Sequence, residues 1–128
     1  MSYYFSKTVD QNFEEAIEKV TGELKKEGFG ILTEIDVKET FKKKLDIDFR
    51  KYRILGACNP KMAHQAINAE SRIGTMLPCN VIVQELENGK VEVTAVDPVA
   101  SMSAVKNDQL GDVAQQVREG LKRAIENL

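Results

Sequence analysis

The sequence lacks several residues and motifs on which common enzyme sites depend. Its 128 residues include no tryptophan, one histidine and two cysteines. It contains no glycine-rich phosphate loop and no nucleophile elbow. The single histidine and the two widely separated cysteines do not form the close-spaced ligand pairs that are typical of zinc sites. We therefore expect no metal site and no cofactor.

The chain also has little net charge. Its 18 basic and 20 acidic side chains give a formal net charge of −2, so no general field attracts nucleic acid or an acidic membrane. The one basic run, Lys42–Lys44, is flanked by acidic residues and is expected on a solvated helix face. No apolar run approaches the ~20 residues of a membrane span, and the first residues do not resemble a signal peptide. We expect a cytoplasmic protein that binds neither nucleic acid nor membrane, with both cysteines as thiols.

Length and composition fit one domain, residues 1–128. The chain is 42% hydrophobic and 30% charged, which is ordinary for a folded globular protein. Hydrophobic spacing and turn residues predict the order β-α-β-α-β-α-β-β-α. The predicted strands span residues 3–8, 29–35, 50–57, 80–86 and 90–96, and the predicted helices span about 13–27, 37–45, 60–71 and 108–128. We expect Asp10 or Asn12 to cap the first helix and Asp108 to cap the last, with residues 99–106 as a loop.

The predicted strands indicate a sheet with helices on one face. Asn88-Gly89 is a strong hairpin signal, so the two strands that flank it should be antiparallel neighbours. The second of them, residues 90–96, alternates apolar and polar side chains, which is typical of a sheet with one covered face. The last helix has a broad apolar stripe and two glycines, Gly111 and Gly120, that permit close approach. We expect this helix to supply the isologous interface of a homodimer.

The most distinctive pattern is a pair of short segments that contain both cysteines, Cys58-Asn59-Pro60 and Pro78-Cys79-Asn80. Each segment lies where a predicted strand meets a turn. In an antiparallel sheet, the intervening helix must return the chain to the sheet end that it left. We therefore expect the two sulfurs to lie within ~10 Å of each other, on the scale of a small pocket.

The pattern leaves three roles open for these cysteines. They can be small buried hydrophobes, parts of a binding site, or a redox pair. The N-terminus of the helix that begins at residue 60 favours a thiolate or a bound anion, and the nearby basic residues could add positive charge. These are Arg53, Lys61 and Arg72. Because Cys58 lies next to that helix terminus, we expect it to be the more reactive thiol.

Three strings in the chain, at residues 52–60, 77–81 and 96–98, resemble the bacterial and archaeal family catalogued as domain of unknown function number 302. Residues 28–30 and 33–36 are similar to that family's second strand, so the resemblance covers essentially the whole chain. Family members tend to have a proline near Ser71 and more aliphatic residues where Thr75 and Met76 stand. The family's name assigns no activity.

The resemblance implies an α+β fold similar to the half-repeat of the TATA-box-binding protein. That fold is a curved, mostly antiparallel sheet of about five strands with helices packed on one face, and its members often pair as dimers. The fold does not bring DNA binding with it, because function belongs to the site and not to the scaffold.

Two hypotheses about function follow. The first is a homodimeric binding module with a pocket for a small molecule or anion, over which residues 76–78 close. The expected ligand-binding residues are Cys58, Asn59, Pro78, Cys79 and Asn80, together with Glu34 and Asp97 as candidate paired carboxylates. The alternative is a thiol-dependent redox enzyme or sulfur carrier, in which Cys58 is the nucleophile and Cys79 resolves the intermediate. The residues alone do not decide whether the protein is an enzyme.

Overall fold

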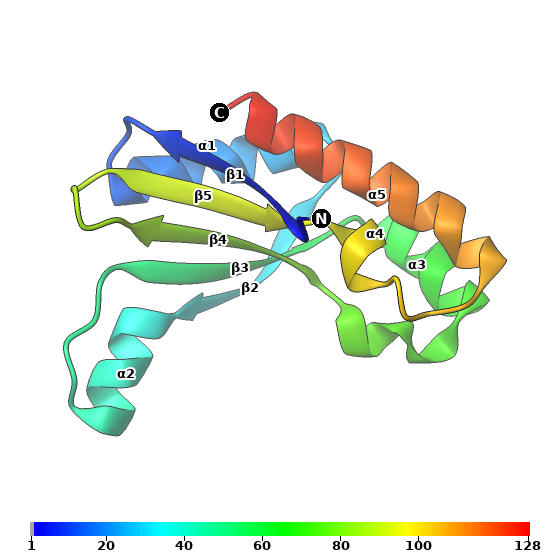
Figure 1. Cartoon of the computed structure of the whole chain (residues 1–128), viewed down its shortest axis with the longest axis horizontal. Coiled ribbons are helices and arrows are strands. Elements are labelled where there is room, and N and C mark those ends of the chain that lie inside the picture. Colours follow the sequence, from blue (N-terminus) through cyan, green and yellow to red (C-terminus); the bar gives the residue numbers. More distant parts are fainter. Residues whose placement is uncertain (1) are drawn as a thin grey trace.

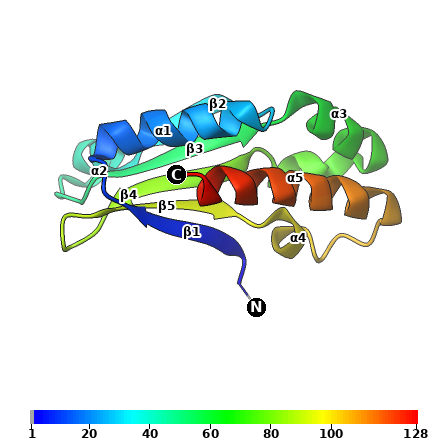
Figure 2. The same cartoon turned by 90° about the horizontal axis from the view of Figure 1, so that it is seen from above.

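A computed structural model describes residues 2–128 as one five-stranded antiparallel sheet with helices packed against it (Figures 1 and 2). The strand order is β1-β5-β4-β3-β2, and every neighbouring pair runs antiparallel. This arrangement confirms the expected α+β class. The strands are β1 (Tyr4–Val9), β2 (Gly30–Asp36), β3 (Tyr52–Cys58), β4 (Cys79–Glu85) and β5 (Val91–Val96).

The helices form one layer over the sheet and a cluster at one of its ends. Helices α1 and α5 lie over the same face, while α3, α4 and η1 gather at the end where β3 and β5 finish and β4 begins (Figures 1 and 2). No helix among residues 2–128 is long and apolar enough to cross a membrane. The helices are α1 (Phe13–Lys26), α2 (Val37–Leu45), α3 (Pro60–Ala69), the 3-10 helix η1 (Ser71–Met76), α4 (Pro98–Ser101) and α5 (Asp108–Glu126).

The main core lies between the covered face of the sheet and helices α1 and α5. Alternate residues of β4 and β5 point into it, as the period of two in these strands predicts. Val81, Val83 and Val93 are completely buried there, against Val20 of α1 and Leu121 of α5. Each such side chain contributes about 1.5–3 kcal/mol when fully buried, so this layer supplies most of the stabilisation of the sheet.

The chain differs from the sequence-based expectation at two helix starts. Asn107, rather than Asp108, caps α5, because its side-chain oxygen accepts from the Gln109 N–H while its amide donates to the Ala69 carbonyl. Residues 98–101 form the short helix α4 where a loop was expected. Asp97 caps this helix by accepting from the Val99 N–H. At the first helix, Asn12 is the cap and forms a reciprocal capping box with Glu15.

The apolar stripe of α5 is used inside the chain. Leu110, Leu121 and Ile125 are all at least 97% buried against the sheet and its neighbouring helices. Gly120 permits close packing on Phe29, since a Cβ at this position would come within 2.9 Å of that ring. Gly111 has no neighbour within 4 Å of the same position. Gly120 therefore packs within the chain, and α5 leaves little apolar surface exposed for the partner contact that the sequence predicted.

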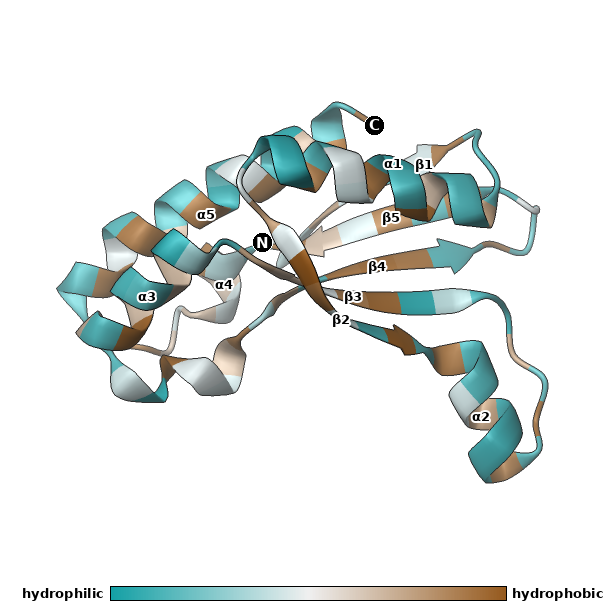
Figure 3. Cartoon of the chain, turned by 180° about the vertical axis from the view of Figure 1, so that it is seen from behind, coloured by the Kyte–Doolittle hydropathy of each residue, from teal (hydrophilic) through white to brown (hydrophobic). Residues whose placement is uncertain are grey.

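No helix among residues 2–128 forms a layer over the opposite face of the sheet, and α2 stands off the β2 edge as an arm (Figures 1 and 3). Helix α2 buries none of its residues. Its Phe41 ring packs edge-on against Phe49, with ring centroids 5.1 Å apart, and Phe49 lies beside Tyr52. Tyr4 and Ile35 on this side are 44% and 48% exposed. The uncovered face and the arm together form the surface on which this protein exposes much of its apolar area.

Candidate functional site: a cavity lined by two thiols

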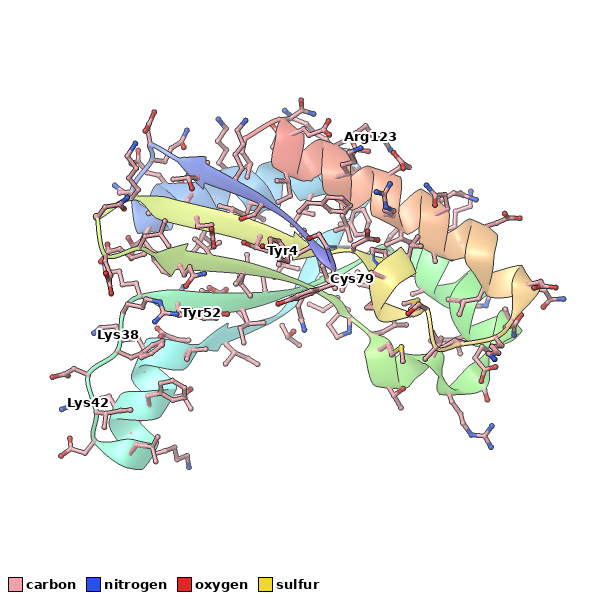
Figure 4. The ribbon with its side chains drawn as sticks, in the orientation of Figure 1. Tyr4, Lys38, Lys42, Tyr52, Cys79 and Arg123 are labelled. Carbon is pink, nitrogen blue, oxygen red and sulfur yellow. The ribbon has the colours of Figure 1, made fainter. Side chains whose placement is uncertain are left out.

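The two cysteine segments meet at one end of the sheet. Cys79 begins β4 and lies opposite Ala57 in the β3–β4 register, and Cys58 is the next residue of β3. Asn59 then caps α3 by accepting from the Met62 N–H at 3.2 Å, and Pro60 takes the first helical position. Figure 4 labels Cys79 at the point where the strands reach α4 and η1. The expected convergence of the two segments is present in the fold.

Both cysteines line a partly enclosed cavity of about 30 Å³. It lies where the main core under the sheet meets a second cluster built from α3, η1, α4 and the first half of α5. This volume holds one or two atoms or molecules the size of water. The wall includes Asn59 and Pro78 and a set of apolar side chains, among them Phe29, Ala57, Ala66, Leu77, Val113 and Val117.

The wall carries no charged side chain. Arg53, Lys61 and Arg72, which could have added positive charge, all lie outside it. Arg53 instead pairs with two carboxylates of β2, at 2.6 Å from Glu34 and 3.3 Å from Asp36. Apart from the thiols and the Asn59 amide, the side chains of the wall are apolar. Because an isolated charge is costly to bury, the cavity does not favour a simple anion.

Burial favours the protonated form of both thiols. It raises the pKa of Cys79 to about 11, with a smaller contribution from the neighbouring Cys58. Burial also raises the pKa of Cys58, which is only partly covered. Burial thus acts against the thiolate that was expected at the helix terminus, since activation requires a lowered pKa. Cys58 is still the more accessible of the two thiols.

Two glycines allow the cysteine segments to approach their neighbours. A Cβ at Gly56 would overlap the Thr33 hydroxyl and come within 2.7 Å of the Pro78 ring. A Cβ at Gly28, which has φ of 87°, would lie 3.0 Å from the Asn59 side-chain nitrogen. Gly56 thus sets the position of Pro78, and Gly28 leaves room for the cap of α3. The peptide bond between Leu77 and Pro78 is cis.

Three of the expected site residues lie elsewhere. Asn80 is exposed on the uncovered face of the sheet, because alternate residues of a strand point to opposite sides. Glu34 belongs to β2 and pairs with Arg53. Asp97 follows β5, which is separated from β2 by β4 and β3, and its carboxylate accepts from the Arg118 guanidinium at 3.2 Å. The expected pair of Glu34 and Asp97 is therefore wrong, since each carboxylate is occupied by a different arginine.

Two methionines in the cavity wall were missed as site residues. Met62 comes from α3 and Met102 follows α4. Nothing in the sequence pattern placed Met102 beside the cysteines. Only the packing of α4 against α5 brings Met102 to this end of the sheet. The cavity wall therefore contains four sulfur atoms, two from thiols and two from thioethers.

A polar groove adjoins the cavity and shares Phe29, Asn59 and Met62 with it. The groove has a volume of about 330 Å³ and runs between the end of α1, the start of α3 and α5. Its polar side chains are Glu27, Gln115, Gln116, Glu119 and Arg123. Arg123, labelled in Figure 4, donates to Glu27 at 2.9 Å. The groove and the cavity are therefore neighbours that share three wall residues.

Comparison with known proteins identifies the family and the fold. Residues 5–128 match the family model described as "Domain of unknown function DUF302". The chain is similar to a solved structure of an uncharacterized conserved DUF302 protein from Bacillus stearothermophilus, with 28% identity, a TM-score of 0.90 and coverage of 98% of both chains. No curated protein matches the chain.

Proposed function

Since the chain belongs to the DUF302 family, whose name assigns no activity, we propose from its own geometry that it is a cytoplasmic, homodimeric binding module. Its site is the cavity between Cys58 and Cys79, and the adjoining groove accommodates any polar part of a ligand. The observation that carries this proposal is the cavity itself, in which two thiols from separate segments share one uncharged wall. Ligand sites are typically apolar hollows with a few placed polar groups.

The wall limits the ligand to a small species that gives up its water easily. With a volume of about 30 Å³ and no charged side chain, the cavity offers a strongly hydrated ion nothing to replace its water. The side-chain oxygen of Asn59 already caps α3, so only its amide N–H groups remain to contact a ligand. These features argue against an anion as the ligand and favour a small uncharged molecule.

The proposal predicts that Ala63→Leu weakens ligand retention. Ala63 lines the cavity, so the larger side chain fills the space that a ligand would take. The measurement is the native mass spectrum of protein purified without added ligand, which reports any species that the chain retains. Wild-type protein is expected to carry an additional mass, and Ala63→Leu is expected to lose it.

The matched control is Ala104→Leu, because Ala104 is exposed and lies outside the cavity wall. This variant should retain the same mass as wild-type protein. Equal retention by both leucine variants would show that the bound species lies elsewhere. Wild-type protein without any retained mass, even from cells grown in rich medium, would count against the binding module as proposed.

The thiol-dependent redox enzyme or sulfur carrier stays as the second candidate, because the two thiols lie on adjacent strands. Its difficulty is the raised pKa of both groups, which leaves little thiolate at neutral pH to act as a nucleophile. A thiol titration that placed the pKa of Cys58 well below the ~8.5 of free cysteine would favour the enzyme over the binding module.

The uncovered sheet face supports the proposed homodimer. We now expect the interface on this face and not on α5. Helix α2 buries none of its residues within one chain, and the apolar side chains beside it include Ile35, Ile54 and Phe41. A second copy of the chain bound to this face would cover these side chains and contact α2. An isologous contact of this kind is the commonest arrangement for small oligomers.

Introducing a charged side chain into this face is expected to dissociate the dimer. We expect wild-type protein to sediment as a dimer at about 10 µM and Ile35→Lys as a monomer, because an unpaired charge would be buried at the interface. Val99→Lys is the control, since Val99 is also an exposed apolar residue but lies on α4. Monomeric wild-type protein, or a dimer that only Val99→Lys disrupts, would contradict the assignment of the interface.

A further inference from the structure

All three tyrosines of the chain line one hollow on the uncovered face of the sheet. Tyr4 belongs to β1 and Tyr52 to β3, both labelled in Figure 4, while Tyr3 precedes β1. The hollow has a volume of about 460 Å³, and alternate residues of β4 and β5 form its floor. Among residues 2–128, it shares no wall residue with the cavity that the cysteines line. The tyrosine hollow is therefore a separate candidate site.

Glu92 is the one charged side chain in the wall that residues 2–128 give this hollow, and it is partly buried. Its Oε1 atom accepts from two neutral donors, the Gln84 amide at 2.9 Å and the Thr94 hydroxyl at 3.4 Å. The cation nearest in this network is Arg50, which donates to Gln84 at 3.0 Å and lies over the Phe49 ring, outside the wall. The second carboxylate oxygen of Glu92 is thus available to a positively charged ligand.

Aromatic rings and a carboxylate attract the same kind of ligand. The face of a tyrosine ring carries negative charge density, so it attracts a cation, and the carboxylate adds a full negative charge. Quaternary ammonium groups suit such a surface, because their charge is spread over apolar methyl groups. We propose that the tyrosine hollow binds a small organic cation with a quaternary ammonium group. The ammonium lies beside Glu92, and the apolar part of the ligand lies against the tyrosine rings.

The rest of the wall favours an organic cation over a metal ion. The amide of Asn80, exposed at the hollow, offers both a donor and an acceptor for a hydroxyl or carbonyl group of the ligand. Ile82 and Val96 add apolar surface. A metal ion needs several oxygen, nitrogen or sulfur ligands, and residues 2–128 contain no cluster of histidine, cysteine or carboxylate side chains that could hold one. The volume of the hollow is within the usual range for small-molecule sites.

This inference goes beyond the binding function proposed for the cysteine cavity, and it uses a different part of the uncovered face from the proposed dimer contacts. Those contacts were assigned to the apolar hollow beside α2, which Ile35 and Ile54 line. The tyrosine hollow lies over β1, β4 and β5, and among residues 2–128 only Tyr52 borders both hollows.

The experiment is a titration with choline chloride, at an ionic strength held constant with sodium chloride. The chain has no tryptophan, so its intrinsic fluorescence comes from the three tyrosines that line the hollow. Choline is expected to change this fluorescence in a saturable manner, with a Kd on the order of 1 mM for so small a ligand. The neutral alcohol dimethylbutanol, in which a carbon atom replaces the nitrogen of choline, should bind at least about 10-fold more weakly.

Substitutions test the carboxylate and the ring separately. Glu92→Gln keeps the shape of the wall but loses its charge, and should weaken choline binding by about 10-fold. Glu87→Gln is the matched control, because it removes the same charge from an exposed residue outside the hollow. Tyr52→Leu should weaken binding by about 5-fold, whereas Tyr52→Phe, which keeps the aromatic ring, should bind like wild type.

Equal affinity for choline and dimethylbutanol, or an unchanged affinity in Glu92→Gln, would overturn the cation site. Ala63→Leu should bind choline like wild type, because Ala63 lines the cysteine cavity and not the hollow. Loss of choline binding in Ala63→Leu would place the cation in the cavity and would equally overturn the proposal. If choline does not bind, but Ala63→Leu still loses a mass that wild-type protein retains, the cavity function stands and only the cation site is wrong.

Discussion

Replacing Gly56 with alanine is expected to lower the free energy of unfolding by about 3 kcal/mol. The added Cβ would overlap the Thr33 hydroxyl and come within 2.7 Å of the Pro78 ring. Gly56 lies on β3 and is paired with Thr33 of β2 and Asn80 of β4, so a shift of either strand would disturb its backbone pairing with β3. Urea denaturation followed by circular dichroism measures this loss.

The control for this substitution is Gly22→Ala. Gly22 is an exposed glycine in the interior of α1 with nothing within 4 Å of a Cβ. Because alanine is the better helix former, this variant should gain about 0.5–1 kcal/mol. A Gly56→Ala protein as stable as wild type would mean that the strands around Pro78 are looser than the structure shows. Such a result would also weaken the case for a preformed cavity.

Raising the pH from 8 to 11 is expected to cost the fold about 2 kcal/mol through Cys79 alone. Burial raises the pKa of this thiol to about 11, above its value in the unfolded chain, so the folded state holds its proton longer. The stabilisation is complete below the unfolded pKa of about 8.5–9 and is lost as the pH rises through the folded pKa. Urea unfolding at a series of pH values measures how the free energy of unfolding falls over this range.

Cys79→Ala should reduce the dependence of the free energy of unfolding on pH between 8 and 11, since it removes the titrating group. Cys58→Ala should retain most of this dependence. The comparison between the two variants cancels the contributions of tyrosine and lysine residues, which titrate in the same range. Parallel slopes for wild type and Cys79→Ala between pH 8 and 11 would show that the Cys79 thiol is accessible to water. The wall of the cavity would then be open at this point.

Local patterns were sufficient to predict most of the secondary structure. The hairpin at Asn88-Gly89 was predicted correctly, because it depends on backbone preferences that act within a few residues. The helix at residues 98–101 was not predicted, because it depends on contacts with a distant part of the chain. That helix is only four residues long, and its cap, Asp97, is held by Arg118 from α5.

The candidate site was predicted in part. The convergence of Cys58 and Cys79 follows from an antiparallel register, which the hairpin and the family resemblance both indicated. Asn80 was placed wrongly because a strand that begins at Cys79 turns its next residue to the other face. Met102 could not be predicted, since its place depends on how α4 packs and not on its neighbours in the chain.

The sequence by itself determined the α+β class, the strand and helix order and the meeting of the two cysteine segments, because hydrophobic periodicity and turn chemistry are local properties. Only the tertiary structure decided what surrounds the thiols. Burial depends on contacts between distant segments, so the raised pKa of Cys79, the uncharged wall and the thioethers became visible only in the packed chain. For the same reason, the apolar stripe of α5 belongs to the core, whereas α2 buries none of its residues.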